Sequence, residues 1–387
     1  MLYRTLSVRV YLAISAPVAL CLFAIVWAWV ALMPLAFLDP EYPAWAAKKQ
    51  MLARCDLGDM IVVGDSRAAA DIMPASMARK TTNLAVGGGE AVEAFGAVRR
   101  AFACPNPPRR VLLSLNPGQF VRPDLFWERT VRFGFLDPRE VAELAEVSAA
   151  THDWSVYENG HNDGLTGRVR AALYAVRFPS LYFGSLVKGG VFLRLWDNRR
   201  ALVARLRTRG QYFFGTAPGC ADIALEGHLD AFRPLPVLDR YFDRLLALLA
   251  ARGVPVAFVA MPVNRETWRA TRPEVRAGFA AYLHRYELKY PNFHVIGPTM
   301  RGWPDRFFGD NYSHLNPTGA RLLSARLALC LDDDASACRL DGAGALAQTA
   351  RPMKEDGVWS RFPTSEFRTS RFPASITAAS ATSSLPR

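Results

Sequence analysis

Short apolar runs alternate along this chain with longer segments in which hydrophobic positions recur every three to four residues. The short runs are typical of buried strands and the longer segments are typical of helices. Strands are expected at residues 60–63, 83–86, 111–115, 256–260 and 293–296. Helices are expected between them, at residues 90–102, 237–252 and 274–288. Because strands separated by helices favour parallel pairing, the pattern predicts an α/β fold with a doubly wound parallel sheet of about five strands.

Residues 10–38 form a continuous apolar stretch without a charged residue. The stretch exceeds the roughly 20 residues that a helix needs to cross a bilayer. Arg4 and Arg9 precede it and acidic residues follow it, so the positive-inside rule places the N-terminus in the cytoplasm. We therefore expect residues 1–40 to form a single-pass anchor in the inner membrane, with the rest of the chain in the periplasm. A cleaved signal peptide, with the Ala-Trp-Ala at residues 44–46 as its cleavage site, is the alternative.

The regular alternation fails in one long region that is rich in Phe, Tyr, Trp, Gly and Arg, where only helical fragments such as 138–150 and 193–207 are expected. We interpret residues from about 118 to 235 as an insertion within a single domain, residues 41–335. Insertions at the carboxyl edge of such a sheet commonly shape active sites, and this one is expected to cap that edge. A separate small domain is the alternative. Residues 336–387 are rich in Ala, Ser, Thr and Arg, which predicts a disordered tail.

The composition of the 387 residues, 51% hydrophobic and 21% charged, is sufficient for a sizeable core. The net charge of +12 comes from scattered arginines, without a Lys/Arg block or Cys and His residues at zinc-binding spacing. We therefore expect no nucleic-acid partner and no metal, and attribute the basic charge to an anionic lipid surface or polymer. In an exported chain the cysteines indicate structural disulfides. Cys330 and Cys338 are close enough to bridge a short loop, but the sequence leaves the pairing open.

Chemically useful residues follow three of the predicted strands at the point where each strand ends. Ser66 follows the first strand directly after a Gly-Asp pair, glycines 87–89 follow the second, and Asn116 follows the third. His314 lies in an Asp- and Asn-rich loop before the last predicted helix. A nucleophilic serine needs a histidine as its base and N–H donors that stabilise the oxyanion. The pattern therefore predicts an acyl-transferring serine enzyme.

These four elements, in this order, resemble the four signature blocks of the SGNH/GDSL hydrolase superfamily over residues 55–332. The resemblance implies a flavodoxin-like three-layer sandwich and no cofactor. It also implies that Ser66 is the nucleophile and His314 its base. The oxyanion hole would consist of the N–H groups of Ser66 and Gly88 together with the side chain of Asn116. Either glycine next to Gly88 is an alternative donor.

The chain departs from the family pattern at two positions. Ser114 stands where the third block usually has a glycine, which changes only a backbone position. The fourth block usually has an aspartate three residues before the histidine, and here that position is Asn311, with Asp310 one residue further back. An asparagine cannot balance the charge of an imidazolium. Either a one-residue bulge allows Asp310 to orient His314, or the enzyme works as a Ser–His dyad, or the site is degenerate and non-catalytic.

A membrane-tethered chain with this site and a large insertion is similar to the bacterial proteins that O-acetylate secreted polysaccharides. That resemblance implies an exported enzyme that transfers an acyl group, acetyl by analogy, to hydroxyl groups of a secreted polysaccharide. It also implies a polytopic membrane acyltransferase as the acyl donor. Hydrolysis of a carbohydrate or lipid ester is the first alternative, because water can replace the sugar. A non-catalytic accessory subunit of an exopolysaccharide synthesis or secretion complex is the second.

Overall fold

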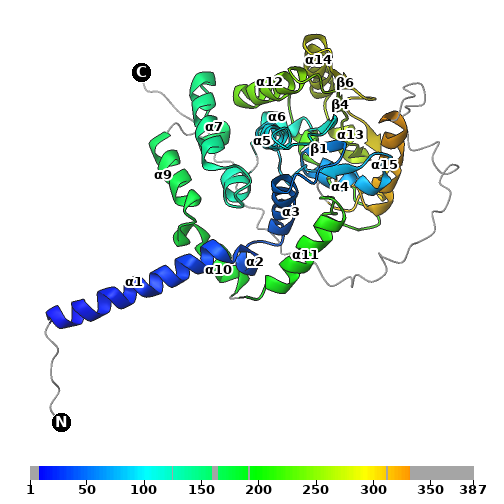
Figure 1. The fold of residues 1–387 in the computed structure, drawn as a ribbon. Coiled ribbons are helices and arrows are strands. Elements are labelled where there is room, and N and C mark those ends of the chain that lie inside the picture. The colour runs from blue at the N-terminus through cyan, green and yellow to red at the C-terminus, as the bar shows by residue number, and fades with distance from the viewer. Residues whose placement is uncertain (1–7, 124, 159–163, 191, 311–312, 332–387) are drawn as a thin grey trace, which may run out of the picture. The chain divides into compact units, whose positions relative to one another are not determined.

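A five-stranded sheet forms the centre of the protein (Figure 1). The structure is a computed structural model that describes residues 8–123, 125–158, 164–190, 192–310 and 313–331. The strands are β1 (Met60–Gly64), β2 (Thr81–Asn83), β3 (Arg110–Ser114), β4 (Val256–Phe258) and β6 (Phe293–Val295). All neighbouring pairs are parallel, in the order β2-β1-β3-β4-β6. The predicted α/β fold with five parallel strands is therefore confirmed. The tail predicted at residues 336–387 lies outside the described residues.

Two features of the strands differ from the prediction. The second strand was expected at 83–86, but the regular pairing of β2 ends at Asn83. The backbone N–H groups of Leu84 and Val86 still donate to the carbonyl oxygens of Val62 and Gly64 on β1, so hydrogen bonding to β1 continues beyond the regular pairing. The side-chain amide of Asn83 donates to the carbonyl oxygens of Ala68 and Ile72. A separate two-stranded parallel sheet was not predicted, because two residues are too few to show a period. It consists of β5 (Val263–Asn264) and β7 (Gly302–Trp303).

Helices cover both faces of the large sheet. They are α4 (Ser66–Asp71), α5 (Ala91–Ala101), α12 (Pro236–Ala250), α14 (Pro273–Lys289) and α15 (Pro317–Leu331). Alternate residues of β1 face opposite sides, as expected for a strand. Ile61 and Val63 belong to one core with α5, α12 and α14, whereas Met60 and Val62 belong to a second core with α4 and α15. The helices predicted at 90–102, 237–252 and 274–288 correspond to α5, α12 and α14.

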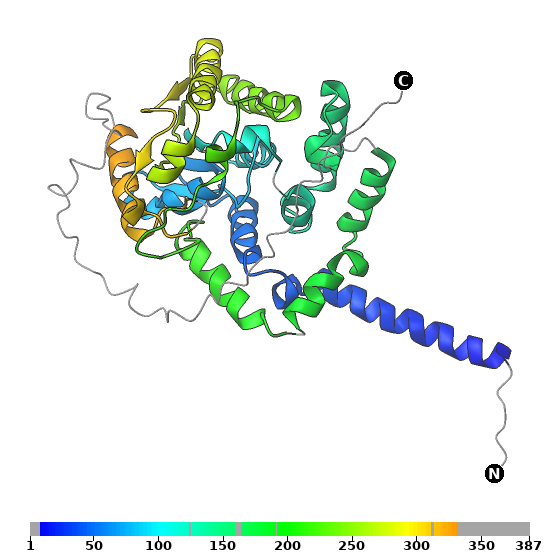
Figure 2. The ribbon, with the colours of Figure 1, turned by 180° about the vertical axis from the view of Figure 1, so that it is seen from behind.

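The N-terminal helix α1 (Val8–Leu32) is long and apolar enough to cross a membrane, and this part of the prediction is confirmed. Most of its side chains are exposed, and the helix extends away from the rest of the domain (Figures 1 and 2). Two helices connect α1 to β1, and three further short helices lie elsewhere in the domain. These are α2 (Pro34–Phe37), α3 (Tyr42–Ala53), η1 (Pro74–Ser76), α13 (Arg265–Ala270) and η5 (Asp305–Phe307).

The connection between β3 and β4, residues 115–255, is more helical than the sequence pattern indicated. Before α12 it contains α6 (Gly118–Val121), the π-helical turn η2 (Phe126–Val131), α7 (Pro138–Thr151), α8 (Ser155–Glu158), α9 (Gly164–Ala175), η3 (Pro179–Tyr182), α10 (Phe183–Gly189), α11 (Leu195–Arg207) and η4 (Leu225–His228). The fragments expected at 138–150 and 193–207 correspond to α7 and α11. α9 was missed, because it contains two glycines and lacks a clear apolar stripe.

One disulfide is formed between two distant segments, Cys55 after α3 and Cys104 after α5. Cys330 is also disulfide-bonded, while Cys338 lies outside the described residues. Cys21 in α1 and Cys220 are free thiols. The disulfide between Cys55 and Cys104 links the two helices that lead into β1 and β3, the strands that carry Ser66 and Asn116 at their ends.

Candidate active site

Ser66 is the first residue of α4, directly beyond the end of β1. Gly64 closes the strand with a φ of +148°, a conformation that residues with a side chain rarely adopt. A Cβ atom at Gly64 would clash with the carbonyl oxygen of Ser114 on β3. The glycine therefore permits both the close approach of the two strands and the sharp turn into the helix, which places the half-buried Ser66 at the carboxyl edge of the sheet.

Asp65 holds this turn together from inside. Its Oδ1 atom accepts from the backbone N–H groups of Arg67 (3.0 Å) and Ala68 (3.2 Å), which caps α4. Its Oδ2 atom accepts from the backbone N–H (3.1 Å) and the side-chain Nδ2 (2.5 Å) of Asn116. Burial raises the pKa of Asp65, while Arg67, these N–H donors and the nearby His314 oppose that rise. Asp65 thus fixes Asn116 beside Ser66.

The glycine loop after β2 returns to the same edge. Gly88 has a φ of +69°, in the left-handed region. A Cβ atom at Gly89 would clash with the carbonyl oxygen of Gly64, so this loop lies directly against the end of β1. The loop is also tied to α3, where the buried Lys48 donates a hydrogen bond to the carbonyl oxygen of Ala85. The structure therefore brings the Ser66, Gly88 and Asn116 segments to one edge.

His314 is buried and is held by Asp310. The Nδ1 atom of His314 lies 2.5 Å from Oδ2 of Asp310, and the His314 backbone N–H donates to Oδ1 of the same carboxylate at 3.1 Å. Ser313 has a φ of +63°, so the backbone reverses directly before the histidine. Asn311 lies outside the described residues. A partner at Nδ1 leaves Nε2 as the nitrogen for proton exchange with a nucleophile.

The same short helix supports both predicted catalytic residues. α4 begins with Ser66 and ends with Asp71, whose Oδ1 atom accepts from the backbone N–H of Leu315 at 2.9 Å. Leu315 directly follows His314. Asp71 is fully buried, and burial raises its pKa well above the ordinary range for a carboxyl. A helix of six residues spans roughly 9 Å, so the histidine loop is anchored within a short distance of the serine.

The connection between β3 and β4 supplies further side chains that the sequence analysis missed. The ring of Phe214 stacks on the ring of His314, with centroids 4.2 Å apart and an interplanar angle of 18°. Glu226 in η4 forms a buried ion pair with Arg67, the residue after Ser66, at 2.9 Å. Neither Phe214 nor Glu226 belongs to a local motif. Asp65 had a detectable signal, because an aspartate directly before a helix is a typical N-cap.

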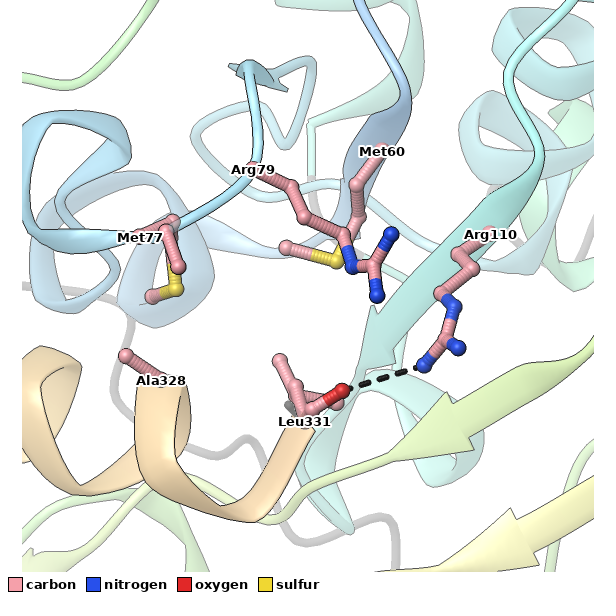
Figure 3. Close-up of a pocket in the computed structure, with 7 residues that line it drawn as sticks. Met60, Met77, Arg79, Arg110, Ala328 and Leu331 are labelled. Atoms are coloured by element: carbon pink, nitrogen blue, oxygen red, sulfur yellow. Dashed lines mark hydrogen bonds between the residues drawn. The ribbon is translucent and has the colours of Figure 1, made fainter. Parts of the chain in front are cut away.

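A small hollow lies away from these residues. Figure 3 shows it at the amino ends of the strands, where Met60 and Arg110 begin β1 and β3. Arg110 donates a hydrogen bond to the carbonyl oxygen of Leu331 at the end of α15 (3.0 Å). The lining also includes Met77, Ala78, Arg79 and Ala328. This hollow contains no carboxylate, histidine or hydroxyl side chain, so it lacks the groups that acyl transfer requires.

The described part of the chain contains no group of three or more His, Cys, Asp or Glu side chains arranged to hold a metal ion. The carboxyl edge brings together the segment of the predicted nucleophile Ser66, a histidine with an acidic partner and the predicted backbone and amide donors. No protein-family model matches the chain, and no curated protein matches it.

Proposed function

We propose that this protein is an SGNH-type acyl-serine enzyme that transfers an acyl group to hydroxyl groups of an exported polysaccharide. The observation that carries the proposal is the buried contact between Asp310 and His314, held beside the Ser66 segment through Asp71. The contact favours Asp310, and not Asn311, as the acid that orients the histidine. The first strand lies between the second and the third, an order that is compatible with the proposed flavodoxin-like sheet and that we take as support for the proposed superfamily.

In the proposed reaction, the Ser66 hydroxyl attacks the carbonyl carbon of the acyl donor while Nε2 of His314 takes its proton. Asp310 stabilises the imidazolium that forms. The tetrahedral intermediate collapses to an acyl-serine, and His314 returns the proton to the leaving group. A sugar hydroxyl then attacks the acyl-serine, with His314 as its base, and the acylated sugar leaves as Ser66 is regenerated.

The oxyanion of both intermediates would be stabilised by the N–H groups of Ser66 and Gly88 and by the Asn116 amide. One N–H of that amide bonds to Asp65, and Nδ2 carries a second hydrogen for the oxyanion. Asp65 is thus proposed as the residue that positions this donor. Removing one oxyanion donor typically costs about 10²–10³ in rate.

The proposed setting is the periplasmic side of the inner membrane, with α1 as a single-pass anchor. α1 has the length and composition for this role. The acceptor would be a secreted polysaccharide, and a polytopic membrane acyltransferase would supply the acyl group. The superfamily assignment rests on the sequence blocks described above, and the likeness to polysaccharide O-acetylation proteins rests on the predicted membrane tether and the large insertion.

The proposal is tested by incubating the full chain in detergent with p-nitrophenyl acetate, with and without an oligosaccharide acceptor. The expected result is acetylated sugar that depends on the acceptor and is lost in Ser66→Ala. Ser76→Ala, a half-buried serine in η1, is the matched control and should retain activity. Free acetate as the sole product would indicate a hydrolase. The absence of turnover that depends on Ser66 would indicate a non-catalytic accessory protein.

A further inference from the structure

The turn between α9 and η3 packs directly on the apolar helix α1. The indole Nε1 of Trp27 donates to the carbonyl oxygen of Val176 at 2.7 Å. The ring of Phe178 contacts the rings of Phe23 and Trp27, with centroid distances of 5.8 and 5.5 Å. Arg177, between these two positions, donates to the carbonyl oxygen of Ala31 near the end of α1. The connection between β3 and β4 is therefore attached to the side of α1.

Phe23 and Trp27 lie in the part of α1 that would cross the hydrocarbon core of a bilayer. A hydrocarbon core about 30 Å thick takes up roughly 20 helical residues, and the uncharged stretch begins after Arg9. Any 20-residue span placed between Arg9 and Leu32 includes Phe23 and Trp27. Phe178, which touches both rings, must then lie at or below the outer boundary of the hydrocarbon. The Arg177 guanidinium reaches the end of α1, as expected for a charged group that extends toward the surface of a bilayer.

The segment that follows this turn exposes large apolar side chains. Phe183 and Val187 are 67% and 66% exposed, and their spacing of four residues places them on one face of α10. Leu193 and Trp196, at the start of α11, are 76% and 68% exposed. Exposed apolar residues this close together mark an interaction surface on a protein. α10 lies beside the C-terminal end of α1, so this surface continues from the membrane contact (Figures 1 and 2).

We propose that Val176, Phe183, Val187, Leu193 and Trp196 form a second membrane-binding element, which lies in the outer face of the bilayer that α1 crosses and binds anionic lipid. This inference rests on α1 being the membrane anchor of the proposed function, and on no catalytic step. We call these five residues the corner surface.

The charges around the corner surface match an anionic headgroup layer. Residues 176–200 contain five basic residues and one acidic residue, and one of the basic residues, Arg194, pairs with Asp39 at 3.5 Å. Lys188 is exposed at the end of α10, and the Arg199 guanidinium lies 5.5 Å from the centre of the Trp196 ring. The single acidic residue, Asp197, is paired with Arg200 at 2.5 Å. Basic side chains are attracted to anionic headgroups, and Trp is enriched at the membrane–water interface.

The test places fluorescent labels on single cysteines of the full chain in nanodiscs that contain phosphatidylglycerol. Native Cys21 labels the middle of α1, with Cys220→Ser removing the second free thiol. Phe183→Cys and Val187→Cys label the corner surface in a Cys21→Ser, Cys220→Ser background. Leu288→Cys, which is 75% exposed on α14, is the matched control away from α1. Quenching is measured at Cys21 with a lipid that carries its spin label on the acyl chain near the bilayer centre, and at positions 183, 187 and 288 with a lipid that carries it near the headgroup.

The expected result is strong quenching at Cys21 and at least roughly twofold more quenching at positions 183 and 187 than at position 288. Replacing phosphatidylglycerol by phosphatidylcholine should reduce quenching at 183 and 187 and leave Cys21 unchanged. If Cys21 is quenched but positions 183 and 187 are quenched no more than position 288, the corner surface does not bind the membrane. The role of α1 as the anchor is then unaffected. That outcome is also expected if a partner protein, and not lipid, covers the surface. No quenching at Cys21 would overturn the anchor and this inference with it, whereas the esterase assay tests the catalytic proposal separately.

Discussion

The two ends of the same strands are built differently. β1 begins with Met60 beside a small hollow and ends with the buried polar network around Asp65. β3 begins with Arg110 in that hollow and ends two residues before Asn116. At the amino ends there is space without reactive groups, and at the carboxyl ends there are reactive groups packed closely together. The residues of the proposed site therefore gather where the strands end, as in other parallel sheets, and not at the hollow where they begin.

The elements that cover the two ends also differ. The amino ends are covered by the last turn of α15, through the bond from Arg110 to Leu331. The carboxyl ends are covered by the connection between β3 and β4, which contributes Phe214 to His314 and Glu226 to Arg67. Substitutions at the carboxyl ends should therefore affect activity or stability strongly, and those at the amino ends weakly.

The largest expected effect is on turnover. Asp310→Asn removes the charge that stabilises the imidazolium of His314 and should lower kcat on an activated ester by about 10⁴. Asn311→Ala should have a mild effect, because the contact at Nδ1 is made by Asp310. Steady-state kinetics of both variants provide the measurement. Turnover close to wild type in Asp310→Asn would remove Asp310 from the site, and modest losses in both variants would indicate a Ser–His dyad.

The next effect is on stability. Glu226→Gln removes the charge of a buried ion pair and leaves the Arg67 guanidinium buried without its counter-charge, so we expect a loss of about 3 kcal/mol in the free energy of unfolding. Glu266→Gln is the matched control, since Glu266 pairs with Arg269 at the surface and should contribute less than about 0.5 kcal/mol. Urea denaturation of the two variants gives both values. Equal losses would mean that burial does not strengthen the pair at the carboxyl edge.

A smaller effect depends on pH. Burial raises the folded-state pKa of Asp71 above its unfolded value of 3.8, so the unfolded state binds fewer protons than the folded state between the two pKa values. Ionisation of Asp71 therefore destabilises the fold as the pH rises above about 4. The stability of Asp71→Asn relative to the wild type should increase over that range. Thermal unfolding of both proteins at several pH values measures this change. A stability difference that does not vary with pH would show that the pKa of Asp71 is not raised by burial.

The smallest effect is expected at the amino ends. Arg110→Gln weakens one hydrogen bond to the C-terminal turn of α15 and should cost at most about 1 kcal/mol of stability. Its kcat on the activated ester should stay within roughly twofold of the wild type, because the hollow contains no reactive group. A loss comparable to that of Asp310→Asn would show that the two ends of the sheet are not functionally distinct.

The local pattern of hydrophobic and polar residues was sufficient to predict much of the fold. The positions of β1, β3, α5, α12 and α14 follow from apolar runs and periodicity, because burial of one face imposes the same pattern wherever such an element occurs. The apolar α1 follows from length and composition alone. The same reasoning began the second strand at residue 83 instead of Thr81, because Thr81 and Thr82 are polar, and it missed α9, which has no strong apolar stripe.

The candidate site, too, was predictable from local pattern in part only. Ser66, Asn116 and His314 were predictable as residues at strand ends or in a loop before a helix, since parallel strands bring such positions to one edge. The choice of Asp310 as the partner of His314 depends on the left-handed Ser313, which the sequence pattern does not specify. The pairing of Arg67 with Glu226 joins residues 159 positions apart, and the contacts of Phe214 and Phe178 depend on how the long connection folds back. Periodicity indicates which face of a helix or strand is buried, whereas the residues that pack against that face depend on the tertiary structure of the whole chain.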